Sequence, residues 1–86
     1  MLGNFLESKE KSGFLVKQGG TVKNWKQRWF VLKNNTLNYY KSPRSQSPAG
    51  SILIKNILAI TQISDPVIRI QDLQLELELS PLHPGL

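Results

Sequence analysis

The chain has 86 residues, a length that suits one small domain with marginal stability, since only about 60% of the unfolded surface of so short a chain is buried on folding. It has no cysteine, which excludes disulfides and thiolate metal ligands or nucleophiles and is compatible with the reducing cytoplasm. The formal net charge is +5, and residues 1–55 contain 10 Lys and Arg against 2 acidic residues, which favours an anionic partner such as phospholipid headgroups or nucleic acid.

Residues 1–12 are interpreted as a lead-in to the domain. Asn4, followed three residues later by Glu7, resembles a helix capping box, and a frayed segment is the alternative. The apolar stretch before Glu7 is too short for a signal sequence, and no apolar run approaches the ~20 residues that cross a bilayer. We therefore expect a cytoplasmic protein that is soluble or peripherally bound to a membrane.

The next stretch predicts three antiparallel strands joined by two turns. Aromatic and β-branched residues are frequent in Phe14–Lys17, Trp25–Leu32 and Leu37–Lys41. Between these segments, Gly19-Gly20 and Asn34-Asn35 tolerate the positive φ angles that tight turns require. The pattern therefore predicts an antiparallel meander.

Side chains alternate across a strand, so the meander has two faces. One face carries apolar residues at one end and basic residues at the other, and its members are Leu15, Lys17, Lys26, Arg28, Phe30, Leu32, Leu37, Tyr39 and Lys41. Because neighbouring strands run antiparallel, Lys17, Lys26, Arg28, Tyr39 and Lys41 should converge. Periodicity alone does not decide which face is the core.

Converging cations predict a binding site for an anion, with a solvated strand end as the alternative. Two like charges ~6 Å apart repel by roughly 0.7 kcal/mol in water, a cost that an arriving anion would remove. Arg28 is the best candidate for a bidentate phosphate contact, Lys17 and Lys26 for point charges, and Tyr39 for a hydroxyl donor.

Residues 42–50 predict a loop, because two prolines, three serines and a glycine occur in this short segment. It is either a plain connection or a phosphorylation target. Ser51–Ile54 then predicts a fourth strand, and Ile57–Ile63 is an apolar segment of undefined type.

The C-terminal part alternates apolar and polar residues, as half-buried strands do. Val67–Ile70 and Leu73–Leu79 predict a hairpin around Gln71-Asp72. Residues 80–86 contain two prolines, which break any helix, and are interpreted as a flexible tail.

Two strings of residues resemble the first two strands of a pleckstrin homology domain: Gly13-Phe14-Leu15-Val16-Lys17 and Asn24-Trp25-Lys26-Gln27-Arg28-Trp29-Phe30-Val31-Leu32. In members that recognise 3-phosphorylated inositol lipids, a lysine ending strand one is followed by basic-x-arginine and two hydrophobic residues. Lys17 and then Lys26-Gln27-Arg28-Trp29-Phe30 fit this pattern, and the match runs from about Ser12 to Ile60.

The resemblance implies a mainly β fold, a strongly bent antiparallel sheet or partial barrel over residues 13–79. The family's seven-stranded barrel is sealed by a C-terminal helix that this sequence lacks, as in a truncated product or a fragment. The expected inner residues Leu15, Phe30, Leu32, Leu37 and Leu53 then need a lid, and open strand edges predict self-association or a completing partner.

The resemblance also implies phosphoinositide-headgroup ligands: Lys17, Lys26, Arg28 and Tyr39, with Lys41 beside them. Lys23 would border the site on the loop 18–24, and Val22 would touch the lipid interface. The tightest binders have an arginine before the glycine that begins strand four, where this chain has Ala49. We therefore expect weak selectivity among isomers.

The function expected is that of a binding module that recruits its protein to membranes, without cofactor, metal or catalysis, because His83 lies beside Pro84 with no cysteine or carboxylate pair near it. Two alternatives remain. A protein-interaction module would use exposed Trp29, Tyr40 and open strand edges. A nucleic-acid binder would stack bases on Trp25, Trp29, Tyr39 and Tyr40, but no RNA-binding signature is present.

Overall fold

The computed structural model of the chain describes residues 10–19 and 22–84, with the side chains of Val22 and Lys23 left out. The helical turn predicted from Asn4 lies outside the described residues. The strands are β1 (Lys11–Gly19), β2 (Val22–Lys33), β3 (Thr36–Tyr40), β4 (Gly50–Leu53), β5 (Ala59–Ser64), β6 (Val67–Gln71) and β7 (Glu76–Ser80), with a short 3-10 turn, η1 (Ile54–Asn56), after β4.

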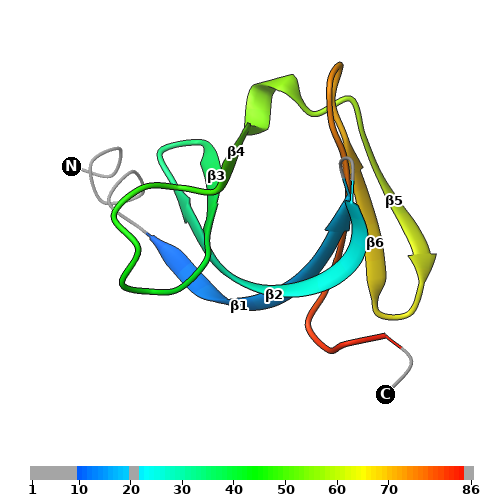
Figure 1. Cartoon of the computed structure of the whole chain (residues 1–86). Helices are drawn as coiled ribbons and strands as arrows, with labels where there is room; N and C mark the ends of the chain where they lie inside the picture. Colours follow the sequence, from blue (N-terminus) through cyan, green and yellow to red (C-terminus); the bar gives the residue numbers. More distant parts are fainter. Residues whose placement is uncertain (1–9, 20–21, 85–86) are drawn as a thin grey trace.

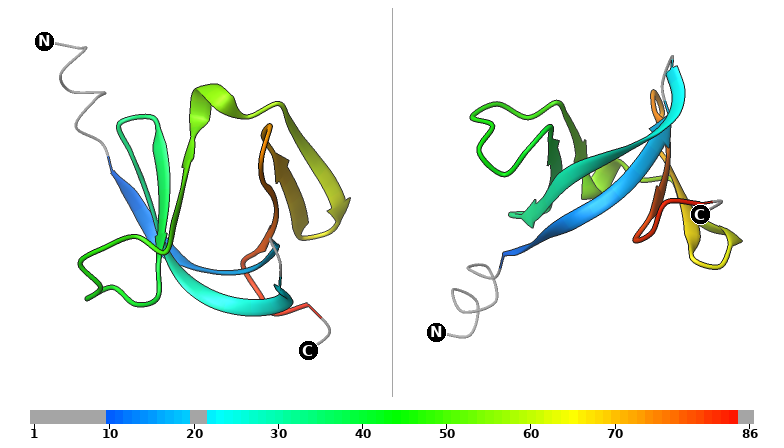
Figure 2. Two further views of the ribbon diagram at one scale, coloured as in Figure 1. Left: turned by 45° about the horizontal axis from the view of Figure 1, so that its top comes forward. Right: turned by 60° about the horizontal axis from the view of Figure 1, so that its bottom comes forward.

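These strands form one antiparallel sheet in the order β4-β3-β2-β1-β7-β6-β5. The sheet is strongly bent, and Figure 1 shows β1 and β2 as its long curved floor. Figure 2 shows that β4 and β5, the two edges of the sheet, are joined by the segment that contains η1. The predicted bent antiparallel sheet is confirmed, and the seven-strand plan extends to Ser80, beyond the stretch where the sequence likeness is visible.

The turn between β2 and β3 forms as its sequence predicts. Asn34 and Asn35 have φ angles of 53° and 61°, and the flanking Lys33 and Thr36 pair across the ladder. Two consecutive positive φ angles in a two-residue hairpin are the geometry that asparagine tolerates and whose twist matches the strands.

The core lies on the concave side of the sheet. Its buried residues are Phe30, Ile52, Ile70, Leu77 and Leu79, and the partly buried residues packed against them are Leu15, Leu37, Tyr39, Ile57, Ile68 and Leu75. The face that carries Leu15 and Phe30 is therefore the inner one, which settles the question that periodicity left open.

The expectation that Leu53 faces inward is wrong. Leu53 is 43% exposed, whereas Ile52 is only 2% exposed. The reason is the register of β4: Gly50 pairs with Tyr39 and Ile52 with Leu37, so the even-numbered residues of β4 share the inner face.

The predicted C-terminal hairpin forms, but its turn lies further along the chain than expected. The Asp72 carboxylate accepts hydrogen bonds from the backbone N–H groups of Gln74 (2.8 Å) and Leu75 (2.6 Å), and the Asp72 N–H donates to the Leu75 carbonyl (2.9 Å). An aspartate that satisfies following N–H groups in this way stabilises a loop instead of a strand. Leu73 therefore belongs to the loop 72–75 and not to β7.

One end of the inner face is open. A groove of about 260 Å³ is lined by Lys11, Ser12, Gly13, Phe14, Leu15, Phe30, Leu32 and Leu37. Residues 10–19 and 22–84 include no α-helix that would cover it.

Candidate anion-binding site

Four of the predicted site residues share the inner face toward one end of the meander. Lys17 of β1 lies directly opposite Lys26 of β2, and Leu15 lies opposite Arg28. Phe30 lies opposite Tyr39 of β3. Directly paired residues point to the same side of a sheet, so the ladder brings Lys17, Lys26, Arg28 and Tyr39 onto one surface. We call these four residues the basic cluster.

The ring of Tyr39 forms the floor of the basic cluster. The Lys17 Nζ atom lies 5.1 Å from the centroid of this ring, a cation–π distance. The other neighbour of the ring is Phe30, with 5.3 Å between the two ring centroids. A Cβ atom at Gly50 would lie 2.2 Å from the Tyr39 Cζ atom, so only glycine leaves room for the ring there.

The electrostatics of the cluster favour an anion. Burial lowers the pKa of Lys17, and the charges of Arg28 and Lys26 lower it further. Burial raises the pKa of Tyr39, an effect that the Arg28 charge opposes, so its hydroxyl stays protonated and able to donate at neutral pH. Among the described residues, none of the ion pairs involves Lys17, Lys26 or Arg28. Within the described part of the chain, no carboxylate therefore compensates this positive charge.

The remaining predicted ligands are not drawn into the cluster by any contact between described residues. Lys41 directly follows β3 and is exposed. The backbone of Val22 and Lys23 begins β2, but their side chains lie outside the described residues. Ala49 is exposed, and its N–H donates to the Tyr39 carbonyl at 2.7 Å.

The aromatic residues expected to be exposed are half-buried on the other face of the sheet. Trp29 packs edge-on against Phe14, with 4.8 Å between the ring centroids. Tyr40 pairs with Trp29 across the ladder and is also half-buried. The tryptophan rings and the basic cluster therefore occupy opposite faces of the meander.

Sequence reasoning missed one exposed apolar residue near this end of the sheet. Leu73, in the loop 72–75, is 88% exposed. This loop leads into β7, whose Leu77 pairs with Gly19, so it lies toward the end of the sheet where β1 ends. Asp72 could have indicated this loop from the sequence, because aspartate favours a loop over the start of a strand.

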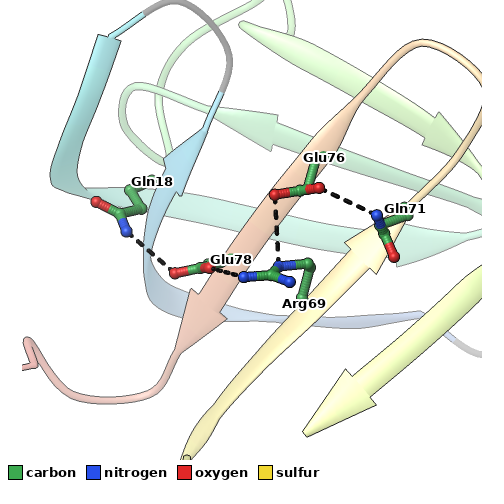
Figure 3. A network of polar contacts seen from close by, with 5 residues as sticks. All are labelled: Gln18, Arg69, Gln71, Glu76 and Glu78. Carbon is green, nitrogen blue, oxygen red and sulfur yellow. Dashed lines mark hydrogen bonds and ion pairs between the residues drawn. The ribbon is translucent and has the colours of Figure 1, made fainter. Parts of the chain in front are cut away.

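A polar network on the outer face holds the end of β1 against the C-terminal hairpin (Figure 3). Glu78 accepts hydrogen bonds from Arg69 Nη2 (2.8 Å) and Gln18 Nε2 (3.0 Å). Arg69 Nε also lies 3.4 Å from Glu76, which accepts a hydrogen bond from Gln71. The hydrogen bond to Glu78 raises the pKa of Arg69. The network therefore fixes the strand that carries Lys17.

The described part of the chain contains no group of three or more His, Asp or Glu side chains that could hold a metal ion. His83 is exposed, and its Nδ1 atom lies 3.0 Å from the carbonyl of the adjacent Pro84. No described helix is long and apolar enough to span a bilayer.

A family model and several known proteins match this chain. The family model described as the PH domain matches residues 9–80. The chain is 51% identical over 49 residues to the "Ankyrin repeat, PH and SEC7 domain containing protein secG" of Dictyostelium discoideum, covering 57% of this chain and 5% of that protein. It is 40% identical over 57 residues to human Cytohesin-4, covering 66% of this chain and 14% of that protein. The chain thus spans a small part of these relatives.

Two solved structures share most of this fold. The C-terminal PH domain of pleckstrin in complex with D-myo-Ins(1,2,3,5,6)P5 has a TM-score of 0.71 and 29% identity, covering 86% of this chain and 79% of that one. The same domain in complex with D-myo-Ins(1,2,3,4,5)P5 has a TM-score of 0.70 and 30% identity, covering 86% and 81%.

Proposed function

Because this chain belongs to the pleckstrin homology (PH) domain family, we propose that it recruits its protein to membranes by binding phosphoinositide headgroups and the anionic membrane surface. Its inner-face basic cluster carries this function. Arg28 is the bidentate phosphate ligand, Lys17 and Lys26 supply point charges, and Tyr39 donates its hydroxyl.

The observation that carries the proposal is the uncompensated charge of the basic cluster. Lys17 is half-buried beside Arg28 and Lys26, and its pKa is lowered first by burial and then by repulsion from these two charges. A phosphate between them would remove this repulsion and raise the pKa of Lys17 again, because an opposite charge favours the charged form. An inositol headgroup offers several phosphates at the spacing of neighbouring side chains.

Relatives support the class of ligand. The C-terminal PH domain of pleckstrin, 29% identical to this chain, is in complex with D-myo-Ins(1,2,3,5,6)P5. This complex supports an inositol phosphate headgroup as ligand. We propose in addition that Lys23 and Lys41 border the bound headgroup, and that Val22 together with exposed Leu73 touches the lipid interface.

A second candidate function is docking on a protein. It is favoured by the apolar groove of about 260 Å³ at the far end of the inner face and by the edge strands β4 and β5. Nucleic-acid binding is less well supported, because the half-buried tryptophans lie on the face opposite Arg28, so bases stacked there would not reach the basic cluster.

Co-sedimentation with vesicles that carry a phosphoinositide series tests the proposal, with a single-stranded oligonucleotide as competitor. We expect binding to rise with headgroup charge and to fall steeply with salt, since each basic residue near an anionic surface contributes on the order of 1 kcal/mol. Because Ala49 stands where the tightest binders have an arginine, the affinities for the different phosphoinositide isomers should differ little. A strong preference for the 3,4,5-trisphosphate over the 4,5-bisphosphate at physiological salt would contradict weak selectivity, and no binding to any vesicle would contradict the function.

A further inference from the structure

The loop between β3 and β4, residues 41–49, is attached at both ends to the basic cluster. It begins two residues after Tyr39, and at its other end the Ala49 N–H donates to the Tyr39 carbonyl at 2.7 Å. Gly50, the next residue, pairs with Tyr39. The side chains of this loop are therefore held close to Tyr39, whose ring contacts Lys17.

The serines of this loop differ in their surroundings. Ser42 and Ser45 bond to each other: their Oγ atoms are 3.2 Å apart, and the Ser42 N–H donates to the Ser45 Oγ atom at 3.2 Å. Ser47 is exposed, and residues 46–48 belong to no strand or helix in the described structure. The Ser47 hydroxyl is thus the accessible one.

The residues around Ser47 suit a kinase that recognises proline after its target. Pro48 follows directly, and Arg44 lies three residues earlier. Ser42 also precedes a proline, Pro43, but its hydroxyl is partly buried and already bonded to Ser45. Kinases bind their target segment in an extended form, which an exposed stretch without secondary structure provides at low cost.

We propose that Ser47 is a phosphorylation site for a proline-directed serine kinase and that the phosphate opposes membrane binding by the basic cluster. In the reaction, the Ser47 oxygen bonds to the γ-phosphorus of ATP, the bond from that phosphorus to ADP breaks, and the hydroxyl proton is released. The second half of this proposal rests on the proposed function.

The reach of the chain supports the effect. Two extended residues span at most about 7 Å, so the Ser47 Cα lies within that distance of the Ala49 Cα. A phosphoserine carries about −1.5 to −2 charges at neutral pH. Placed beside the basic cluster, this charge would both attract the cations that should bind the headgroup and repel the anionic surface. Since each charge near the surface is worth on the order of 1 kcal/mol, affinity should fall roughly tenfold or more.

The test uses the full chain, a purified proline-directed serine kinase and ATP. Mass spectrometry locates the phosphate, and co-sedimentation compares modified and unmodified protein on phosphatidylcholine vesicles that contain phosphatidylinositol 3,4,5-trisphosphate. We expect a phosphate on Ser47 and at least a tenfold loss of binding. Ser47→Ala should prevent both changes, whereas Ser42→Ala should leave both intact.

Two outcomes would overturn the inference: no phosphate on Ser47, or a stoichiometric phosphate that leaves vesicle binding unchanged. Failure of the proposed function is seen separately, as unmodified protein that does not sediment with the vesicles. That result would also overturn the regulatory half of the inference, while mass spectrometry would still decide the modification site.

Discussion

Lys17, a residue of the proposed headgroup site, has an environment that favours ligand binding at the expense of folding stability. Its side chain lies on the inner face of β1, opposite Lys26 and over the ring of Tyr39. Burial and the charges of Arg28 and Lys26 lower its pKa, so the folded state holds this proton less well than the unfolded chain does. The charge of Lys17 therefore lowers the stability of the folded state.

Lys17→Met should therefore separate binding from stability. Methionine keeps the apolar stem that packs on the ring but removes the charge. We expect the free energy of unfolding to rise by on the order of 0.5 kcal/mol at pH 7, while affinity for trisphosphate vesicles falls about tenfold. Urea denaturation and co-sedimentation measure the two effects. A variant that loses stability and binding together would show that Lys17 is structural.

The pH dependence has a definite sign. The folded-state pKa of Lys17 lies below its ordinary value of 10.5, so the folded protein loses this proton before the unfolded chain does. The cost of burying the charge, and its repulsion from Arg28 and Lys26, disappear as the pH rises through the lowered pKa. The free energy of unfolding of the wild type should therefore rise relative to that of Lys17→Met as the pH increases from the lowered pKa to 10.5. Denaturation curves at a series of pH values check this. An advantage of Lys17→Met over the wild type in free energy of unfolding that grows with pH would contradict it.

Gly50 is the second residue on which the proposed site depends, because the Tyr39 ring occupies the space of a Cβ atom. Gly50→Ala should displace the ring from Lys17, weaken vesicle binding several-fold and cost about 1–3 kcal/mol of stability. Gly13→Ala is the matched control, since a Cβ there meets nothing within 4 Å. Thermal unfolding and co-sedimentation of both variants test this, and equal effects would refute the role of the ring.

At the scale of elements, the C-terminal hairpin is fixed to β1 through Glu78, which bridges Arg69 on β6 and Gln18 on β1. The Glu78 side chain is 17% exposed, whereas that of Glu76, the other carboxylate beside Arg69, is 48% exposed. Hydrogen bonds to a charged group count for more where water is excluded. Glu78 should therefore contribute more than Glu76 to the free energy of unfolding.

We expect Glu78→Ala to destabilise the protein by about 1–3 kcal/mol, because it removes the hydrogen bonds that Glu78 accepts from Arg69 Nη2 and Gln18 Nε2. Glu76→Ala removes the same charge from a more exposed site and should cost no more than about 1 kcal/mol. Urea denaturation at one pH compares them. Equal losses would mean that net charge, and not the bridge, is what matters.

The strands were largely predictable from sequence because their periodicity is local. Alternation alone placed Lys17, Lys26, Arg28 and Tyr39 on one face, and the Asn34-Asn35 turn fixed the register of β2 and β3. Leu53 was misplaced because the register of β4 depends on how the long loop before it closes, which no short-range pattern encodes. Likewise, the loop around Leu73 is set by hydrogen bonds from backbone N–H groups to Asp72, which alternation of apolar residues does not show.

At the scale of the whole molecule, the fold separates the charges of the chain. The basic cluster occupies the inner face of β1, β2 and β3, while two of the acidic residues, Glu76 and Glu78, are engaged with Arg69. Among the described strands, β4 and β5 form the two edges of the sheet and each pairs on one side only, and Ile60 on β5 is 62% exposed. An apolar edge of this kind is a template for pairing with a second chain.

We therefore expect self-association through β5, seen as a sedimentation coefficient that rises with protein concentration. Ile60→Lys should keep the protein monomeric and change its stability by no more than about 0.5 kcal/mol, because the side chain is exposed. A wild-type monomer at all concentrations, with slow amide exchange through residues 26–32 and a sharp melt, would contradict this expectation.

We propose that a shaped cluster on the inner face, and not diffuse positive charge, binds the headgroup. The most direct measurement is co-sedimentation of Arg28→Ala and Lys33→Ala with trisphosphate vesicles. The two variants lose the same charge, but Lys33 lies at the far end of β2, where its Nζ atom is 3.8 Å from Glu10. We predict at least a tenfold loss of affinity for Arg28→Ala and less than a twofold loss for Lys33→Ala, since a bidentate phosphate contact is worth about 1.5–3 kcal/mol. Equal losses in the two variants would contradict the account.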